Sequence, residues 1–394
     1  MDISTFHTLL TTSGQEILQA ATALAPRESD FLIHFQSLSK TFPPDLARAA
    51  LEIAILRLKA ATKFPFADKL YLTRQALEQA SSFEISSYRA ERFQQFPYIA
   101  DLGCSIGGDT FALAQIAPTI GLDADLLRLS MASANLLALG LSPHTRLIQS
   151  NLTFTIPVKA GSVALFFDPA RRAGDHRFFS VQQYQPPLSI LQPWLPDFPS
   201  LGVKISPGVD MAELNRYEAE VEFISLHGEL KEAVLWFGSC KTAFRRATVL
   251  PGPYQLVVHL PNRMLLAPTR ISNPGSFLYE PDPAVIRSGL VTNLAEMLNA
   301  SQVDPEIAYL TSDALSPTPF ARVWRIEDWF PFQLKRLRAY LRQHHIGHLT
   351  VKKRGSPIEP DFLIHQLRLK GDQEGILVLT HLRGEPIVII CNGV

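Results

Sequence analysis

The feature that most restricts the fold of this chain is a short glycine-rich segment at residues 98–110. An apolar run, Tyr98-Ile99-Ala100, ends at Asp101, and three glycines follow within the next seven residues. An apolar stretch of helical spacing begins directly afterwards at Phe111. This order predicts a buried strand, a tight turn and the start of a helix. Glycine lets the backbone approach a ligand closely, and a helix start presents free N–H groups. The segment is therefore a candidate cradle for a nucleotide or nucleoside.

The residues after this segment alternate predicted strands with predicted helices. The strands are expected at 98–102, 119–122, 146–149, 163–167 and 201–205. A polar residue stands at or just after each strand end: Asp101, Asp123, Asn151, Asp168 and Ser206. Strand–helix alternation predicts a mostly parallel, doubly wound sheet with helices on both faces. Because ligands bind at the carboxyl ends of strands in such α/β sheets, we expect these polar residues to surround one site.

Three regions of the chain differ in pattern. Residues 1–95 are predicted to be helical, since apolar residues recur at helical spacing within 46–60 and Thr73 could cap a further helix. Prolines crowd the stretch 250–275, which we interpret as the exit from the α/β part. We therefore expect a helical region at 1–95, an α/β domain at 96–265 and a separate small domain at 276–394.

Charge is distributed unevenly, although the whole chain has a formal net charge of zero. Residues 321–370 contain eleven lysines and arginines against four aspartates and glutamates. The basic residues include four in a helix predicted at 332–344 and the run Lys352-Lys353-Arg354. Such clustering is typical of a surface that binds phosphate groups, and a solvated charged face without a partner has the same pattern.

Several classes of protein are disfavoured by composition. The three cysteines are far apart and form neither a metal-ligand pair nor a disulfide framework, which suits a reducing cytosol. The histidines are isolated, so we predict no metal site. The N-terminus has no signal-peptide pattern, and no run of about 18 apolar residues occurs. We expect a cytoplasmic protein that does not bind or span a membrane.

Two enzyme classes share parts of the glycine-rich pattern. Gly103-Cys104-Ser105-Ile106-Gly107 matches the nucleophile elbow of serine hydrolases, but that elbow lies in mid-sheet and the sequence before it here is helical. A nicotinamide-dependent oxidoreductase would use a degraded G-x-G-x-x-G, with Asp123 on a ribose. Asp101 puts an acid at a position that NAD-binding strands usually keep apolar, and Ser105 replaces the second glycine.

The third interpretation rests on a resemblance to a family. Asp101-Leu102-Gly103-Cys104-Ser105-Ile106-Gly107 resembles the first motif of class I S-adenosylmethionine (SAM) methyltransferases, an acid followed by x-G-x-G-x-G, with Ser105 for the middle glycine. Gly121-Leu122-Asp123 resembles the second motif, and Ser150-Asn151 falls where the family places an acid beside the adenine. Asp168-Pro169-Ala170-Arg171-Arg172 stands at the fourth motif, next to the methyl-donor centre.

The wider chain resembles one bacterial group of these methyltransferases. The segments that carry this resemblance are Ala76-Leu77-Glu78-Gln79-Ala80, Asp168 to Arg172, Val203-Lys204-Ile205-Ser206-Pro207-Gly208, Leu278-Tyr279-Glu280-Pro281-Asp282-Pro283-Ala284 and Val351-Lys352-Lys353-Arg354-Gly355. The group implies an N-terminal helical region, a Rossmann-like class I methyltransferase core and a small α+β domain that is THUMP-like at the C-terminus.

The resemblance implies that SAM is the cofactor and methyl donor. The residues that it places on the donor are Asp101, Gly103, Ser105, Gly107, Asp123 and Asn151. A carboxylate suits the role of Asp123, because its two oxygens can accept hydrogen bonds from both ribose hydroxyls. From the helical region, Thr73 is expected to close over the donor.

On the acceptor side, the resemblance points to Asp168, Pro169 and Arg171 as catalytic residues. In methyltransferases that act on amino groups, the related motif is Asp or Asn, Pro, Pro and an aromatic residue. The acid and the next carbonyl accept the hydrogens of the target amine, and the aromatic ring stacks on the base. Arg171 stands in the aromatic position, where a guanidinium could stack. Arg171 and Arg172 could equally grip a phosphate, or pair with a neighbouring acid to hold the loop.

RNA is the suggested methyl acceptor, with a base amino group of tRNA or rRNA as the expected target, because THUMP domains are associated with RNA modification. On this hypothesis the RNA-binding residues include Arg172, Lys352, Lys353 and Arg354. Two alternatives remain open: methylation of a small molecule or protein, and a non-catalytic protein that binds SAM or RNA.

Overall fold

The computed structural model describes residues 1–393 apart from 154–155, 171, 174–175, 178–179 and 262–269, and only the backbone of 172–173 and 176–177. The chain divides into two compact units. The first consists of Met1–Glu220 and Ala233–Thr242, and the second of Val221–Glu232 and Ala243–Val394. The domain boundaries expected at 95, 265 and 276 stay predictions. In the part of the chain that the structure describes, no helix combines the length and apolar content needed to span a bilayer.

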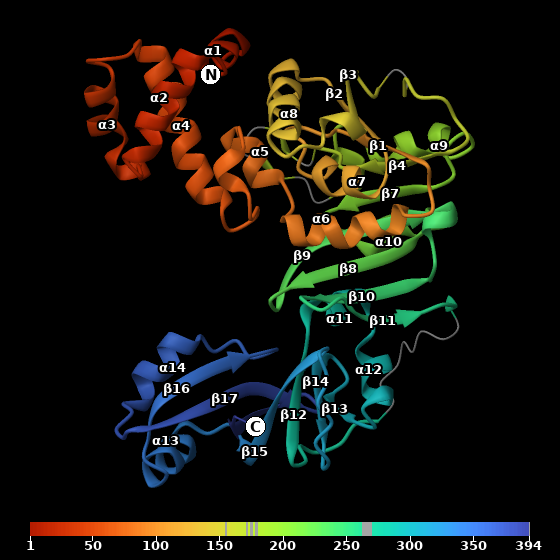
Figure 1. Cartoon of the computed structure of the whole chain (residues 1–394). Coiled ribbons are helices and arrows are strands. Elements are labelled where there is room, and N and C mark those ends of the chain that lie inside the picture. The colour runs from red at the N-terminus through yellow and green to blue at the C-terminus, as the bar shows by residue number, and fades with distance from the viewer. Residues whose placement is uncertain (154–155, 171, 174–175, 178–179, 262–269, 394) are drawn as a thin grey trace. The chain divides into compact units, whose positions relative to one another are not determined.

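The first unit begins with a series of helices, as the sequence predicts (Figure 1). They are α1 (Ile3–Leu9), α2 (Thr12–Ala23), α3 (Phe31–Leu38), α4 (Pro44–Ala60), α5 (Arg74–Gln79) and α6 (Phe83–Ala90). Side chains at the helix starts explain several of these bounds. Asp2 caps α1, Thr11 caps α2, and Pro44 occupies the first position of α4, where no intrahelical N–H is needed.

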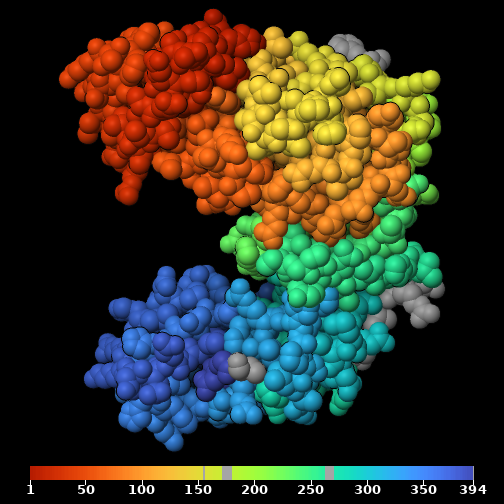
Figure 2. Space-filling model, in the orientation of Figure 1, coloured from red at the N-terminus to blue at the C-terminus, as the bar shows by residue number. Residues whose placement is uncertain are grey.

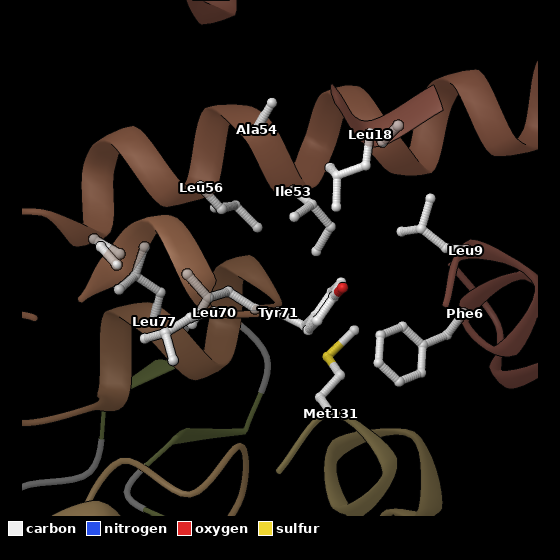
Figure 3. Packing of buried hydrophobic residues seen from close by; sticks show 14 of the residues in the cluster. Phe6, Leu9, Leu18, Ile53, Ala54, Leu56, Leu70, Tyr71, Leu77 and Met131 are labelled. Carbon is white, nitrogen blue, oxygen red and sulfur yellow. The ribbon is translucent and has the colours of Figure 1, made fainter. Parts of the chain in front are cut away.

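The buried faces of α1 to α5 share one apolar cluster with α8 (Leu126–Ala138). Figure 3 shows Phe6, Tyr71 and Met131 pointing toward one another from three separate segments of the chain. The rings of Phe6 and Tyr71 meet edge to face, with centroids 5.4 Å apart. In Figure 2 the red and orange helices are in continuous contact with the yellow α/β part of the same unit. The helical region therefore packs directly on the α/β part.

A buried asparagine joins the helical region to the glycine-rich turn. Asn135 of α8 accepts a hydrogen bond from the N–H of Tyr71 at 2.7 Å and donates to the carbonyl oxygen of Tyr71 at 3.0 Å. The same side chain donates to the carbonyl oxygen of Ile106, within the turn, at 3.0 Å. Because Asn135 is fully buried, these bonds are shielded from water and hold the two segments in a fixed relation.

The sheet of the first unit has the strand order β3-β2-β1-β4-β7-β9. Its strands are β1 (Tyr98–Leu102), β2 (Thr119–Asp123), β3 (Thr145–Gln149), β4 (Val163–Phe167), β7 (Leu201–Ile205) and β9 (Glu229–Phe237), which starts in the second unit. The first five are parallel, and β9 is antiparallel to β7. The predicted strands are confirmed. The chain order reverses between β1 and β4, and open α/β sheets bind ligands at such a point.

Shorter elements complete the first unit. They are α7 (Thr110–Ile116), which follows β1, then β5 (Arg172–Ala173), β6 (His176–Arg177), α9 (Leu191–Trp194) and α10 (Met211–Leu214). The helix between β2 and β3 is α8, as the strand–helix alternation of the sequence predicts. Its start is fixed by Asp125, whose side chain accepts a hydrogen bond from the N–H of Arg128.

The second unit contains strands of two sheets. β8 (Glu220–Leu226) is parallel to β10 (Arg245–Leu250), which is antiparallel to β11 (Tyr254–Val258). A seven-stranded sheet has the order β13-β14-β12-β15-β18-β17-β16. Its strands are β12 (Phe277–Pro281), β13 (Ser301–Asp304), β14 (Ile307–Ser312), β15 (Ala321–Pro331), β16 (Ile346–Lys353), β17 (Gln373–Leu382) and β18 (Glu385–Asn392).

The helices of the second unit are α11 (Pro283–Ser288), α12 (Val291–Met297), α13 (Leu334–Gln343) and α14 (Pro360–Leu367). The predicted helix at 332–344 is confirmed as α13. Leu337 and Leu341 of α13 are buried in a cluster that includes Leu377 of β17 and Val388 of β18. This packing fixes which face of α13 remains outside.

Candidate active site

The turn between β1 and α7 has the backbone that its glycines predict. Gly103 and Gly107 have φ angles of +82° and +93°, in the left-handed region that strains any other residue. A Cβ on Gly103 would lie 3.1 Å from the carbonyl oxygen of Asp168. Glycine at this position therefore allows the turn to approach the end of β4 closely, with peptide groups and no side chain between them.

Asp123, at the end of β2, holds the middle of the turn. Its Oδ2 accepts a hydrogen bond from the N–H of Ser105 at 2.9 Å, and its Oδ1 accepts one from the N–H of Asp125 at 2.9 Å. Each carboxylate oxygen can accept a further hydrogen bond. Because Asp123 is only partly buried, it keeps this capacity for a ligand with two hydroxyls.

The Ser105 hydroxyl lies in the same turn. Its oxygen is buried and has no hydrogen-bond partner among the described residues. A serine nucleophile needs a base within hydrogen-bond reach, and the described contacts provide none. The position of Ser105 thus does not support the hydrolase interpretation. A buried hydroxyl without a partner does fit a turn that completes its hydrogen bonds on a ligand.

Asp101, the last acid of β1, is fully buried and accepts a hydrogen bond from the Thr110 hydroxyl at 2.6 Å. Burial, and after it the charge of Asp109, raises the pKa of Asp101 to about 8. The pKa of a buried acid falls when a cation arrives beside it. Asp101 is therefore an uncharged carboxyl near neutral pH that a cationic ligand group would ionise.

Two residues of this site, Arg89 and Asp109, were not predicted from the sequence. Arg89 of α6 is almost completely buried and forms an ion pair with Asp109, which also accepts a hydrogen bond from the Ser86 hydroxyl at 2.8 Å. The guanidinium of Arg89 lies over the ring of Phe166, 4.8 Å from its centroid. This ion pair connects α6 to the start of α7. Arg89 stands in a stretch without a recognisable motif, so only its helical spacing among apolar residues could have indicated burial.

Asp168, at the end of β4, forms an ion pair with Lys204 of β7. Lys204 Nζ lies 2.5 Å from Oδ2 of Asp168 and donates to the carbonyl oxygen of Gln79 at 3.2 Å. The Lys204 side chain is only 2% exposed, whereas that of Asp168 is 20% exposed. Asp168 thus has one oxygen held by a buried cation and part of its surface open. Lys204 joins the ends of β4, β7 and α5.

The predicted donor residue Thr73 caps α5, since its hydroxyl accepts a hydrogen bond from the N–H of Ala76 at 3.2 Å. The other end of α5 approaches the glycine-rich turn, because a Cβ on Gly108 would lie 3.5 Å from the Cβ of Ala80. The helix α5 therefore lies beside the turn. A contact of Thr73 with a donor stays a prediction.

The other predicted site residues of the first unit differ in how much of them the structure describes and in how exposed they are. Pro169 is buried directly after Asp168. Arg171 lies outside the described residues, and Arg172 is described only as backbone in β5. Asn151 is exposed beyond β3, where its Oδ1 accepts a hydrogen bond from the N–H of Thr153 at 3.0 Å. The acids Asp101, Asp123 and Asp168 end the adjacent strands β1, β2 and β4, as expected.

In the second unit, the predicted RNA-binding run is already paired with acids. Lys352 Nζ lies 2.7 Å from Glu280 Oε2, and the guanidinium of Arg354 lies 3.8 Å from the same carboxylate. Lys353 Nζ lies 2.5 Å from Oε1 of Glu359. Two carboxylates therefore offset two of these three positive charges.

Family comparisons match both ends of the chain. A family model described as THUMP domain-like matches residues 321–393. A second, described as a domain of unknown function (DUF8688), matches residues 2–60.

Whole-length comparisons cover most of the chain. Two curated relatives from Mycobacterium tuberculosis, strains CDC 1551 and H37Rv, are each 33% identical over 351 residues, which is 86% of this chain and 94% of theirs. Both are named uncharacterised S-adenosylmethionine-dependent methyltransferases. A crystal structure from Porphyromonas gingivalis W83, assigned as a methyltransferase, aligns over 96% of this chain and 98% of its own, with a TM-score of 0.76 and 20% identity. At 20% identity, the likeness to the Porphyromonas gingivalis structure shows a shared fold alone.

Proposed function

Since the chain belongs to the S-adenosylmethionine-dependent methyltransferases, we propose that its methyl acceptor is RNA. The family membership makes the chain an enzyme that uses SAM as its cofactor, and its C-terminus is a THUMP-like domain. The observation that carries the proposal is that one chain contains both a SAM-dependent methyltransferase and a THUMP-like domain, and that the THUMP-like domain includes a strongly basic stretch.

We assign the donor to the turn between β1 and α7. Its glycines give the turn a left-handed backbone that packs closely on the end of β4, and the Ser105 hydroxyl is a buried polar group without a partner among the described residues. The free acceptor capacity of Asp123 suits two ribose hydroxyls. Asp101 suits the ammonium of the methionine part, because a cation would favour its charged form. These features fit SAM, which when bound supplies a methyl group activated by a sulfonium.

We assign the acceptor side to Asp168 and Pro169. Methyl transfer needs the acceptor atom aligned with the donor and, where that atom carries protons, a group that receives a hydrogen bond from them. The open part of the Asp168 carboxylate can accept a hydrogen bond from an amino group. Lys204 keeps this carboxylate in place through its ion pair. We therefore propose a base amino group as the target, with Arg171 or Arg172 on the base or a phosphate.

Charge supports RNA over a small molecule. Residues 321–370, which largely coincide with the THUMP-like match, have eleven basic and four acidic residues. An excess of basic residues in one domain favours a polyanion, whose phosphates bind each cation with release of counterions. The three cysteines are free thiols and buried, which agrees with work in the reducing cytoplasm, where tRNA and rRNA are found.

The test is incubation of the full chain with SAM carrying a radioactive methyl group and a fractionated cell extract. The proposal predicts label in the tRNA or rRNA fraction that alkali or nuclease releases. Label in protein or in small molecules would assign the enzyme to another acceptor. Donor binding by calorimetry without label in any fraction would instead support a non-catalytic binding protein.

A further inference from the structure

The basic residues of the second unit belong to two structurally different groups. The first group is the run Lys352-Lys353-Arg354, in which Lys352 and Arg354 share the carboxylate of Glu280. The guanidinium of Arg354 also lies 5.5 Å from the centroid of the Tyr309 ring. These contacts use the charges within the unit itself, so a polyanion would have to displace Glu280 to gain them. The second group belongs to α13.

The outward face of α13 carries its unshared charges. Lys335 and Arg342 are seven residues apart, which puts them on one exposed stripe of the helix, separate from the stripe of the buried Leu337 and Leu341. Arg336 lies on the adjacent stripe and is also exposed. Leucines on one face and cations on the other give α13 a fixed orientation, because the apolar face is held by the core of the unit.

The contacts of these cations leave their charge available. For the second unit as described, no ion pair joins Lys335, Arg336 or Arg342 to a carboxylate. Arg336 lies over the Phe330 ring, 4.2 Å from its centroid, a contact that keeps the positive charge. Arg338, by contrast, donates to the carbonyl oxygen of Gln366 at 2.6 Å and secures α13 to α14.

Aromatic and imidazole groups stand at the end of the same helix. The rings of Tyr340 and His344 are stacked, with centroids 4.2 Å apart and an interplanar angle of 23°. His344 and His348 are exposed. Exposed flat rings beside cations are the combination that single-stranded RNA uses, because bases stack on the rings and phosphates meet the cations. Burial raises the pKa of Tyr340, and the nearby acids Asp328 and Glu327 of β15 add to the rise.

We propose that the outward face of α13, formed by Lys335, Arg336, Arg342 and His344, is the main RNA-binding surface of the second unit. The inference rests on the proposed function and makes it more specific. The run 352–354 then has a structural role, since its ion pairs join β16 to β12 and to Glu359. In Figure 1, α13 lies at the edge of the blue part of the chain, and Figure 2 draws the atoms of the same part as spheres.

Two double variants with the same change of charge test this surface. Lys335→Ala/Arg342→Ala removes two unshared cations, and Lys352→Ala/Lys353→Ala removes two ion-paired ones. Binding of the full chain to fluorescein-labelled bulk tRNA and to a labelled single-stranded RNA is measured by anisotropy over a range of salt concentrations. Thermal unfolding and SAM calorimetry show that each variant is folded.

The α13 variant is expected to bind RNA about tenfold more weakly and to lower the slope of log K against log salt by about 1.4, as loss of two phosphate contacts requires. The 352–353 variant should stay within about threefold of wild type. The proposed surface is wrong if the folded α13 variant binds RNA with wild-type affinity. It is also wrong if both variants lose RNA affinity by the same factor. If wild type binds no RNA and instead binds anionic lipid vesicles, the proposed function itself fails.

Discussion

The donor site and the α13 surface hold their ionisable groups in opposite surroundings. Asp101 is fully buried, and Asp168 is held by a buried lysine. Lys335 and Arg342 of α13 face solvent. Charges in a low-dielectric interior interact strongly and over short distances, whereas exposed charges are weakened by water and screened by salt. The donor site should therefore depend on single carboxylates, and RNA binding on the number of available cations.

The largest effect is expected at Asp168. Asp168→Asn should lower the methyl-transfer rate on the order of a hundredfold or more, because the acceptor amine loses a charged hydrogen-bond partner. It should also destabilise the fold by about 3 kcal/mol, since Lys204 is left as a buried cation without its anion. Single-turnover transfer and urea unfolding measure the two effects.

The double variant Asp168→Asn/Lys204→Met separates these two effects. It removes both charges, so stability should return toward the wild-type value while the transfer rate stays low. Recovery of the rate along with stability would mean that Asp168 has only a structural role, and the contrast between the two regions would lose its main support.

A pH dependence is expected from Asp101. Its pKa is about 8 in the folded chain, against an ordinary value of 3.8. Below pH 4 the carboxyl is protonated in both states. Between pH 4 and 8 the unfolded chain has lost this proton and the folded chain retains it. The free energy of unfolding of wild type should thus fall by a few kcal/mol over this window relative to Asp101→Asn.

Urea unfolding of wild type and Asp101→Asn at pH 4.5, 6 and 8 measures this difference in free energy of unfolding. Because the two proteins are compared at the same pH, the contributions of other titrating groups cancel. Parallel stability curves would show that Asp101 is ionised in the folded chain. The comparison would then break, because the donor site would hold an ordinary carboxylate.

A smaller effect concerns Asp123. Asp123→Ala should weaken SAM binding about thirtyfold, which corresponds to about 2 kcal/mol for a hydrogen bond to a charged group. Asp125→Ala is the matched control, because it removes a neighbouring acid that caps α8. The control should lose about 1 kcal/mol of stability and keep its SAM affinity. Equal affinities of the two variants, measured by calorimetry, would remove Asp123 from the donor site.

The smallest effect is expected at Thr73. Thr73→Ala should cost about 1 kcal/mol of stability through loss of the α5 cap, as should Thr11→Ala at the α2 cap. Only Thr73→Ala should also weaken SAM binding, if α5 closes over the donor as expected. The same SAM affinity in both variants would leave Thr73 as a cap alone.

The turn could be predicted from the sequence because its contacts are close along the chain. Asp101 bonds to Thr110 and Asp123 to Ser105, and glycines mark two of the three left-handed positions, the third being Ser105. The ion pairs could not be predicted in this way. Lys352 is paired with a residue 72 positions away, and whether a cation is free depends on the tertiary fold. The same limit applies to the seven-stranded sheet, whose neighbouring strands β15 and β18 are far apart along the chain.

The central claim is that the first unit recognises the donor and the α13 face recognises RNA. Steady-state methyl transfer to bulk tRNA, with SAM and RNA varied separately, tests it most directly. Asp123→Ala is predicted to raise KM for SAM and leave KM for RNA unchanged, and Lys335→Ala/Arg342→Ala to do the reverse. A rise in the same KM for both variants would contradict the claim.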